Sequence, residues 1–368
     1  MSSIRTLNDV NRERSAVFTG EIHSRSGLIV FRWLPAVAPV LALVYPACLT
    51  LLERSVAMVR HSGVTQTPPA WIAVVVFVAL VFAVPTGSLM VGHVLGNVQP
   101  VTRRQRHGRW AAHLAFTAPS MLVSMGNFAR LLNARSLVTP AWLVLWSGAA
   151  LFVLLSPQTV VTPIKTPGLR RLPLRTFHAI SAAGILVMFL VPHISNHTTA
   201  IWSGATHMGV MRVLRTVYRS GTGEPILVGL LAFQMISGLA LLLPRVRINK
   251  SGVFDTLQTM SGIYLFVFLT SHMTAAFSAR AANVDTNWLW LVGPSGTLLA
   301  GPSMTVVPHY FLGPLILFTH VACGLRNVRF AGSGSRLLSD RWAVGMIATG
   351  ALVGSVILAA LFGVHVRS

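Results

Sequence analysis

Nine apolar runs divide this chain, and they limit its fold more than any other feature of the sequence. They cover roughly residues 30–52, 70–92, 110–132, 138–156, 174–199, 224–244, 257–279, 305–327 and 342–364. A helix needs about 20 apolar residues to cross a bilayer. Because 53% of the residues are hydrophobic and only 10% are charged, the composition is also that of a membrane protein. We therefore predict an all-α fold, a polytopic transmembrane helical bundle of about nine spans.

The basic residues indicate how the chain is oriented in the membrane. With the N-terminus placed inside, most of the 29 lysines and arginines fall in inner segments, as the positive-inside rule requires. The net charge of +21 is then explained by topology, and no nucleic-acid partner is expected. Basic loops also attract anionic membrane lipids. No cleavable signal peptide is expected, and both a bacterial inner membrane and a mitochondrial membrane fit the sequence.

The polar side chains inside the predicted spans are mainly histidines, with some glutamines. All eight acidic residues lie outside the spans or at their ends. Because a cation- or proton-coupled carrier normally keeps a carboxylate at membrane depth, this pattern disfavours a small-molecule carrier. Between the fifth and sixth runs, apolar residues alternate with Arg212, Arg215 and Arg219, which predicts a short interfacial helix.

Two pairs of predicted helices are copies of one another. The segment "TFHAISAAGILVMFLVPHISNH" matches "DTLQTMSGIYLFVFLTSHMTAAF", and "FQMISGLALLL" matches "THVACGLRNV". The matched positions are His178 with Gln258, Ser181 with Ser261, His193 with His272, and Gln234 with His320. We therefore predict an internal two-helix repeat within a five-span bundle at residues 157–368, preceded by an accessory or degenerate four-span region at residues 1–156. Repeats of this kind often place a ligand between them.

The predicted topology sorts the polar residues of the repeat into two layers. The outer layer holds His193 and His272, with His197 and His309 nearer the surface. The inner layer holds His178, Gln234, Gln258 and His320. Within helix five, His178 and His193 are about 22 Å apart along the axis, at 1.5 Å per residue.

A buried imidazole costs free energy unless it is bonded. A backbone carbonyl or a serine on a neighbouring helix would satisfy a single histidine. Two histidines at matched positions and equal depth suggest instead the two axial ligands of a haem iron. Small residues at 181–184, at 261–262, at Gly238 and at Gly324 would give a porphyrin room, although they are equally typical of helix packing. Zinc is disfavoured, because it needs three or four ligands and no carboxylate is available.

The pattern "RTFHAISAAGILVMFLVPH", "FQMISG", "LQTMSGIYLFVFLTSH" and "HVACGLR" resembles the cytochrome b membrane anchor of succinate dehydrogenase and fumarate reductase. The resemblance covers about residues 170–365. It implies a helical bundle with one or two b haems and a quinone site, which passes electrons between peripheral flavoprotein and iron–sulfur subunits and quinone. It also implies that the His193 and His272 positions bind an outer haem, and that the His320 and Gln234 positions bind an inner haem.

The inner site departs from the family's pattern, because glutamine is a poor ligand for ferric haem. Three outcomes stay open for it. The inner haem is absent, or His178 replaces Gln234 as the partner of His320, or the pocket holds only a quinone. In the last case His178, Gln258, Thr259 and Ser261 would be its hydrogen-bond donors.

A second resemblance favours a different function. Asn196 and His197, followed by "MRVLRTVYRSGTGEP" and "QMISGLALLL", look like the Mdm10-complementing-protein-like membrane family. That family implies a non-redox scaffold or a role in lipid homeostasis, with the same bundle. The histidines would then be bonded only to neighbouring residues. Haem b in an electron-transport anchor and a scaffold without haem are thus the two functions that the sequence supports.

Overall fold

The computed structural model describes residues 7–61, 68–98, 100–161, 172–247, 252–300, 304–333 and 335–366. Within these ranges the protein is helical, and eight helices are long and apolar enough to cross a membrane. The all-α polytopic bundle is therefore confirmed. Residues 1–6 and 162–171, which carry part of the basic charge used to predict topology, lie outside the described residues. The spanning helices are α1 (Leu7–His61), α2 (Pro68–Asn97), α5 (Val138–Leu155), α6 (Leu172–Ile185) continued by η2 and α7, α9 (Gly223–Arg247), α10 (Val253–Ala281), α12 (Val306–Ser333) and α13 (Arg336–Leu361).

The predicted span at 110–132 differs from a single apolar helix. It consists of α3 (Arg103–Ala115) and α4 (Ala118–Leu131), which meet at a turn over Phe116 and Thr117. Thr102 caps α3 in a capping box with Gln105, so the helix begins earlier than the apolar run does. Pro119 lies in the first turn of α4, where its missing N–H costs no helix hydrogen bond.

The predicted span at 174–199 contains a turn of π-helix. Residues Leu186–Leu190 form η2, and α7 (Val191–Thr199) follows directly. Pro192 cannot donate a backbone hydrogen bond to the preceding turn, which favours a wider turn there. The π turn therefore sets the direction in which His193 leaves the helix.

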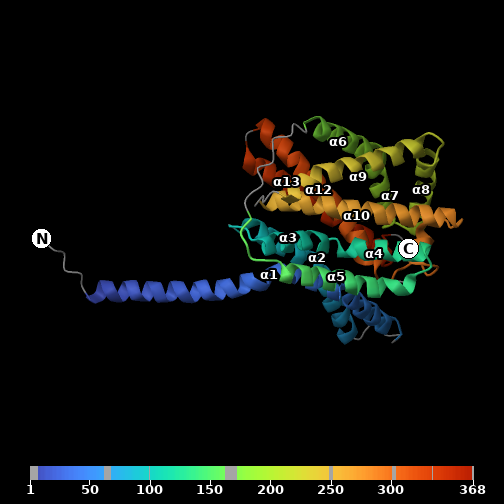
Figure 1. The fold of residues 1–368 in the computed structure, drawn as a ribbon. Helices are drawn as coiled ribbons and strands as arrows, with labels where there is room; N and C mark the ends of the chain where they lie inside the picture. The colour runs from blue at the N-terminus through green and yellow to red at the C-terminus, as the bar shows by residue number, and fades with distance from the viewer. Residues whose placement is uncertain are drawn as a thin grey trace.

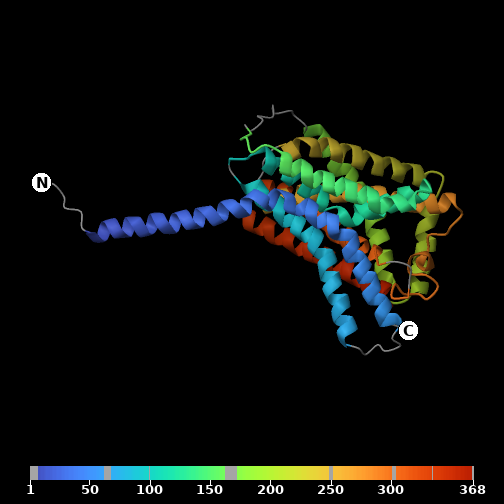
Figure 2. The ribbon, with the colours of Figure 1, turned by 60° about the horizontal axis from the view of Figure 1, so that its bottom comes forward.

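The connecting segments gather at two ends of the bundle. In Figure 1, α8 (Gly204–Tyr218) lies across one end of α9 and α10, as an interfacial helix would. We call this the α8 end; α9 ends and α10 begins at the opposite end. Figure 2 shows the hairpin of α1 and α2 extending from the side of the bundle at an angle to the other helices. Val213 and Val217 on α8 are exposed, consistent with lipid contact.

The repeated helix pairs pack as pairs. Helix α6 packs on α9, α10 packs on α12, and α9 contacts α10. Helix α10 also packs on α2, α3 and α4 of the N-terminal region. One buried cluster joins Phe116 to Met260, Tyr264, Leu312 and Ile316, so the regions 1–156 and 157–368 share a core.

Gly108 of α3 lies where α3 crosses α1. A Cβ built there would lie 2.6 Å from Pro35 Cα and 2.7 Å from its carbonyl oxygen, and neither backbone atom can move aside. We expect Gly108→Ala to lower the free energy of unfolding by about 1–3 kcal/mol, the usual cost of overpacking. The matched control is Gly126→Ala in α4, where a Cβ meets nothing within 4 Å. Thermal unfolding in detergent should separate the two variants; equal midpoints would contradict the close crossing.

Candidate functional site

The structure brings the two predicted outer ligands together. His193 projects from α7 and His272 from α10, and their ring centroids lie 6.0 Å apart with the rings inclined at 75°. Each ring stacks on a phenylalanine one turn earlier in its own helix, His193 on Phe189 and His272 on Phe268. The stacking limits the orientation of both imidazoles.

Further aromatic side chains connect the two histidines into a closed circuit. His193 contacts His197 at 4.8 Å, and His197 contacts Tyr310 at 6.3 Å, between ring centroids. Tyr310 contacts His309, which stacks on Phe268 at 4.5 Å. We call these six residues the outer ring: His193, His197, Tyr310, His309, Phe268 and His272. We call His193 and His272 the outer pair. His197 and His309, which the sequence placed near this pair, both belong to the outer ring.

The outer pair has no hydrogen-bond partner among the residues that the structure describes. His309 differs, because its Nδ1 lies 3.3 Å from Ser120 Oγ. His193 and His272 lie deep among protein atoms, yet both keep intermediate exposure. Part of each side chain is thus left uncovered by protein, and the polar atoms of both imidazoles still need partners.

The inner layer in the first copy of the repeat is a bonded network. Ser237 Oγ donates to the Phe233 carbonyl at 2.6 Å, so it accepts from His178 Nδ1 at 2.8 Å. This arrangement gives His178 the tautomer with a hydrogen on Nδ1, and leaves Nε2 as an acceptor. The Gln234 amide donates to the His178 backbone carbonyl at 2.9 Å.

The second copy of the repeat, α10 and α12, has the same network, but here the glutamine is on the first helix and the histidine on the second. Ser261 Oγ lies 3.0 Å from His320 Nδ1, and the Gln258 amide nitrogen lies 3.3 Å from the same atom. Each helix pair thus holds one histidine and one glutamine, with histidine on α6 in one pair and on α12 in the other. Gln234 therefore belongs to the His178 network and is bonded to that residue. The amide oxygens of Gln234 and Gln258 are buried with no hydrogen-bond partner among the described residues.

The predicted small-residue sites divide into two kinds. Gly238 faces His178, and Gly262 faces His320, because a Cβ at these positions would lie 3.5 Å and 3.2 Å from the respective imidazole Cε1. A Cβ built at Gly184 or Gly324 would meet no neighbouring atom within 4 Å. At the first two positions, therefore, the missing side chain makes room for the inner histidines.

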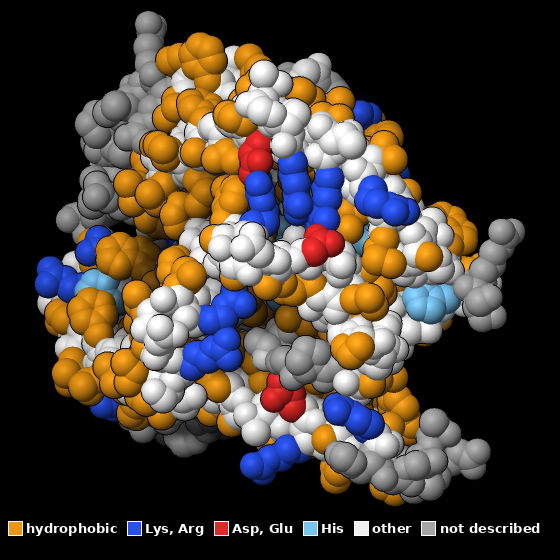
Figure 3. All heavy atoms as spheres, turned by 90° about the vertical axis from the view of Figure 1, so that its right-hand side faces the viewer, with side chains coloured by type: hydrophobic (Ala, Val, Ile, Leu, Met, Phe, Trp, Pro, Cys, Tyr) orange, Lys and Arg blue, Asp and Glu red, His pale blue; other side chains and the backbone are white. Residues whose placement is uncertain are grey.

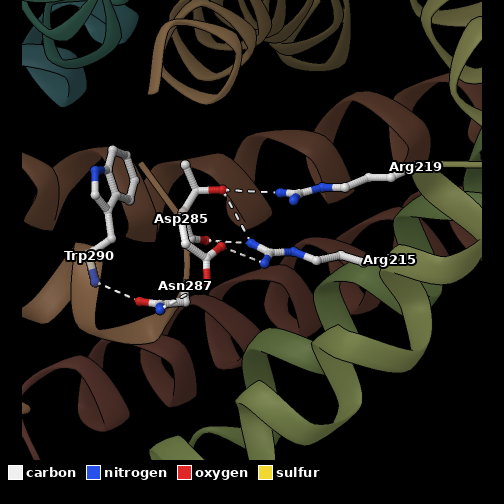
Figure 4. Close-up of polar contacts among 6 residues, drawn as sticks. Arg215, Arg219, Asp285, Asn287 and Trp290 are labelled. Carbon is white, nitrogen blue, oxygen red and sulfur yellow. Dashed lines mark hydrogen bonds and ion pairs between the residues drawn. The ribbon is translucent and has the colours of Figure 1, made fainter. Parts of the chain in front are cut away.

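Arg215 of α8 and Arg219 directly after it make polar contacts that the sequence did not predict. Arg215 donates to Asp285 Oδ1 at 2.6 Å and to the Thr286 carbonyl at 3.0 Å, and Arg219 reaches the Thr286 hydroxyl, as Figure 4 shows. Arg280 of α10 forms a two-pronged contact with Glu224 at the start of α9. In Figure 3 the basic side chains gather on this face. The Arg215–Asp285 pair holds α8 onto the loop after α10, and the Arg280–Glu224 pair joins α10 to the start of α9.

His207 of α8 is a further buried histidine, only 3% exposed, for which the sequence indicated no role. Its Nε2 lies 3.3 Å from Asn196 Nδ2, and its ring contacts His197 and Trp288. Burial, reinforced by the Arg215 charge, lowers the pKa of His207 to about 4. The folded protein therefore keeps this imidazole neutral at pH values where an unfolded chain would protonate it.

This shift predicts that acid destabilises the protein. An unfolded histidine has a pKa of about 6.5, so the unfolded state binds the extra proton as the pH falls from 7 towards 4. His207 alone should cost about 3 kcal/mol of stability over that range. We expect His207→Gln to have a flatter dependence of its unfolding midpoint on pH. Parallel profiles for the two proteins would contradict the shift.

In the described part of the chain no group of three or more histidine, cysteine, aspartate or glutamate side chains could hold a metal ion directly. His193 and His272 are the candidate ligand pair that the structure brings together. Cys323 is buried and Cys48 is partly buried, both as free thiols. Comparison of the chain with family models, curated proteins and solved structures gave no match.

Proposed function

We propose that this protein binds one haem b between His193 and His272 and passes electrons to or from quinone as the membrane anchor of a respiratory-type complex. The observation that carries the proposal is the outer pair itself: two partly exposed imidazoles, with ring centroids 6.0 Å apart and no hydrogen-bond partner in the described chain. In this arrangement His193 and His272 would supply the two protein ligands of the haem iron.

The inner layer supports a single haem. His178 and His320 already bond to serine hydroxyls, and Gln234 is bonded to the His178 backbone. Gln234 could bind iron only through its amide oxygen, which is a poor donor for ferric iron. The haem would supply one-electron exchange, while His193 and His272 would hold its iron and the other outer-ring residues would surround it.

The inner layer suits a quinone better than a second haem. The unpartnered amide oxygens of Gln234 and Gln258 can accept hydrogen bonds from the hydroxyls of a reduced quinone. The Gln258 amide and the His178 and His320 rings can rearrange to bond its oxidised form. Peripheral flavoprotein and iron–sulfur subunits would then dock at the end of the bundle opposite the α8 end, because that end is nearest the inner layer.

A non-redox scaffold is the second candidate, and one observation favours it. Ser237 and Ser261 satisfy the inner histidines, as the scaffold reading requires of every histidine in the bundle. The outer pair is where the two functions differ, because haem binding would give His193 and His272 a shared partner that a scaffold does not supply.

Haem content distinguishes the two functions. Full-length protein produced with haem available should show a b-type reduced-minus-oxidised spectrum with one haem per chain. Two haems per chain would refute the assignment of the inner layer. A colourless preparation would refute haem binding and favour the scaffold.

A further inference from the structure

Four arginines at the α8 end are used by neither proposed function. They come from α8, from the position directly after it, and from the last turn of α10. We call this set the α8 arginines: Arg212, Arg215, Arg219 and Arg280. The predicted topology places this end on the outer side of the membrane, where the positive-inside rule calls for few basic residues. Topology therefore does not account for the set.

Ion pairs within the protein use only part of this charge. Arg215 is paired with Asp285, and Arg280 is paired with Glu224. Arg212 is exposed and makes no hydrogen bond or ion pair with any residue that the structure describes. The two pairs therefore leave the positive charge of Arg212 unbalanced.

Arg219 is held weakly by the protein. Its guanidinium lies 3.5 Å from the Thr286 hydroxyl, which is longer than an ordinary N–H···O hydrogen bond (Figure 4). Arg215 and Arg280 are its positively charged neighbours, and the two carboxylates near it already pair with them. A bound anion would therefore offset a repulsion that the described part of the chain leaves in place.

The two unbalanced arginines lie on one face of the helix. Positions three or four residues apart are neighbours on a helix surface, so Arg215 lies between Arg212 and Arg219. The Arg219 N–H donates to the Arg215 carbonyl at 2.9 Å, so the helical turn continues to Arg219. Arg212 and Arg219 are both exposed and about 10 Å apart along the axis. Because arginine side chains are long, a single lipid headgroup can contact both.

Exposed apolar side chains lie beside the α8 arginines. Val213 and Val217 are 68% and 60% exposed, and at about 100° per residue they lie on the face next to the basic one. Trp202, just before α8, and Trp290, in α11 (Trp288–Val292), are also exposed near this end. Tryptophan is enriched where hydrocarbon meets the lipid headgroups. We therefore expect the arginines to lie at the depth of the lipid phosphates.

We propose that the α8 end binds one anionic phospholipid, whose phosphate contacts Arg212 and Arg219 and whose acyl chains lie against Val213 and Val217. Guanidinium groups donate hydrogen bonds to phosphate oxygens, often two at a time. A zwitterionic lipid brings its own cation and leaves the surplus positive charge unchanged, so the site should select an anionic lipid. A soluble acidic partner would match the arginines but not the exposed valines beside them. The proposal does not depend on haem or quinone.

Native mass spectrometry of the full-length protein in detergent tests the proposal. The protein is titrated with phosphatidylglycerol or with phosphatidylcholine of identical acyl chains, and retained lipids are counted. We expect a preference of about fivefold or more for phosphatidylglycerol. Arg212→Gln combined with Arg219→Gln should reduce this preference to less than about twofold. Val213→Ser combined with Val217→Ser should weaken retention of both lipids alike and keep the preference.

Arg54→Gln combined with Arg135→Gln is the matched control, because it removes the same charge from two exposed arginines outside α8. This variant should keep the full preference. Equal retention of the two lipids by the unaltered protein would overturn the proposal and leave the α8 arginines to a soluble acidic partner.

Three other results would also contradict a lipid site. One is an unchanged preference in a folded variant that lacks both Arg212 and Arg219. Another is an equal loss of preference in the control, which would indicate attraction to the total charge of the protein. The third is displacement of phosphatidylglycerol by an equal concentration of inorganic phosphate, which would indicate a site for soluble anions.

Discussion

Replacing either His193 or His272 with alanine is expected to abolish the b-type spectrum and to lower haem content at least tenfold. Each substitution removes one of the two imidazoles that face each other at 6.0 Å, and no other histidine takes the same position on the repeat. The measurement is the reduced-minus-oxidised difference spectrum of each purified variant, normalised to protein.

The control for this pair is His365→Ala. The His365 ring lies 3.0 Å from the Ala200 carbonyl near the C-terminus and is not part of the outer ring. It should retain the full spectrum. A variant at His193 or His272 that folds normally and keeps its haem would show that the ligands lie elsewhere.

The largest expected effect on stability is that of Trp142→Ala. Trp142 of α5 is fully buried, donates its indole N–H to the Ala42 carbonyl of α1 at 2.9 Å, and contacts Tyr45 and Trp146. Truncation would leave a large cavity and an unpaired carbonyl between α1 and α5. We expect a loss of about 3–5 kcal/mol, measured by denaturant titration in detergent micelles.

Trp342→Ala provides the comparison, since that side chain is 57% exposed on α13. Its loss should change the free energy of unfolding by less than 1 kcal/mol. If both tryptophan variants unfold at the same denaturant concentration, α1 is not held to α5 by this contact.

The spans were predictable because bilayer thickness requires long apolar runs, and eight of the nine correspond to single candidate spans. The interruptions within two of these predicted spans could not be predicted from hydropathy. The turn at Phe116–Thr117 and the π turn before Pro192 fall within apolar sequence, where hydropathy does not change. Helix α1 also extends well beyond its apolar run, from Leu7 to His61.

The outer pair was predictable for a different reason. Matched positions in a repeat lie at equal depth, so His193 and His272 were expected to face each other, and they do. The hydroxyl partners in the inner layer depend on side-chain rotamers, and spacing alone did not indicate Ser237. The Arg215–Asp285 pair joins residues 70 positions apart, which no local pattern indicates.

The most direct test of the central claim is the electron paramagnetic resonance spectrum of the oxidised, haem-loaded protein. Two imidazole ligands on one iron predict a low-spin ferric signal in the unaltered protein, and its loss in both His193→Ala and His272→Ala. A high-spin signal in the unaltered protein, which indicates an iron with an open or weak axial position, would contradict ligation by His193 and His272 together.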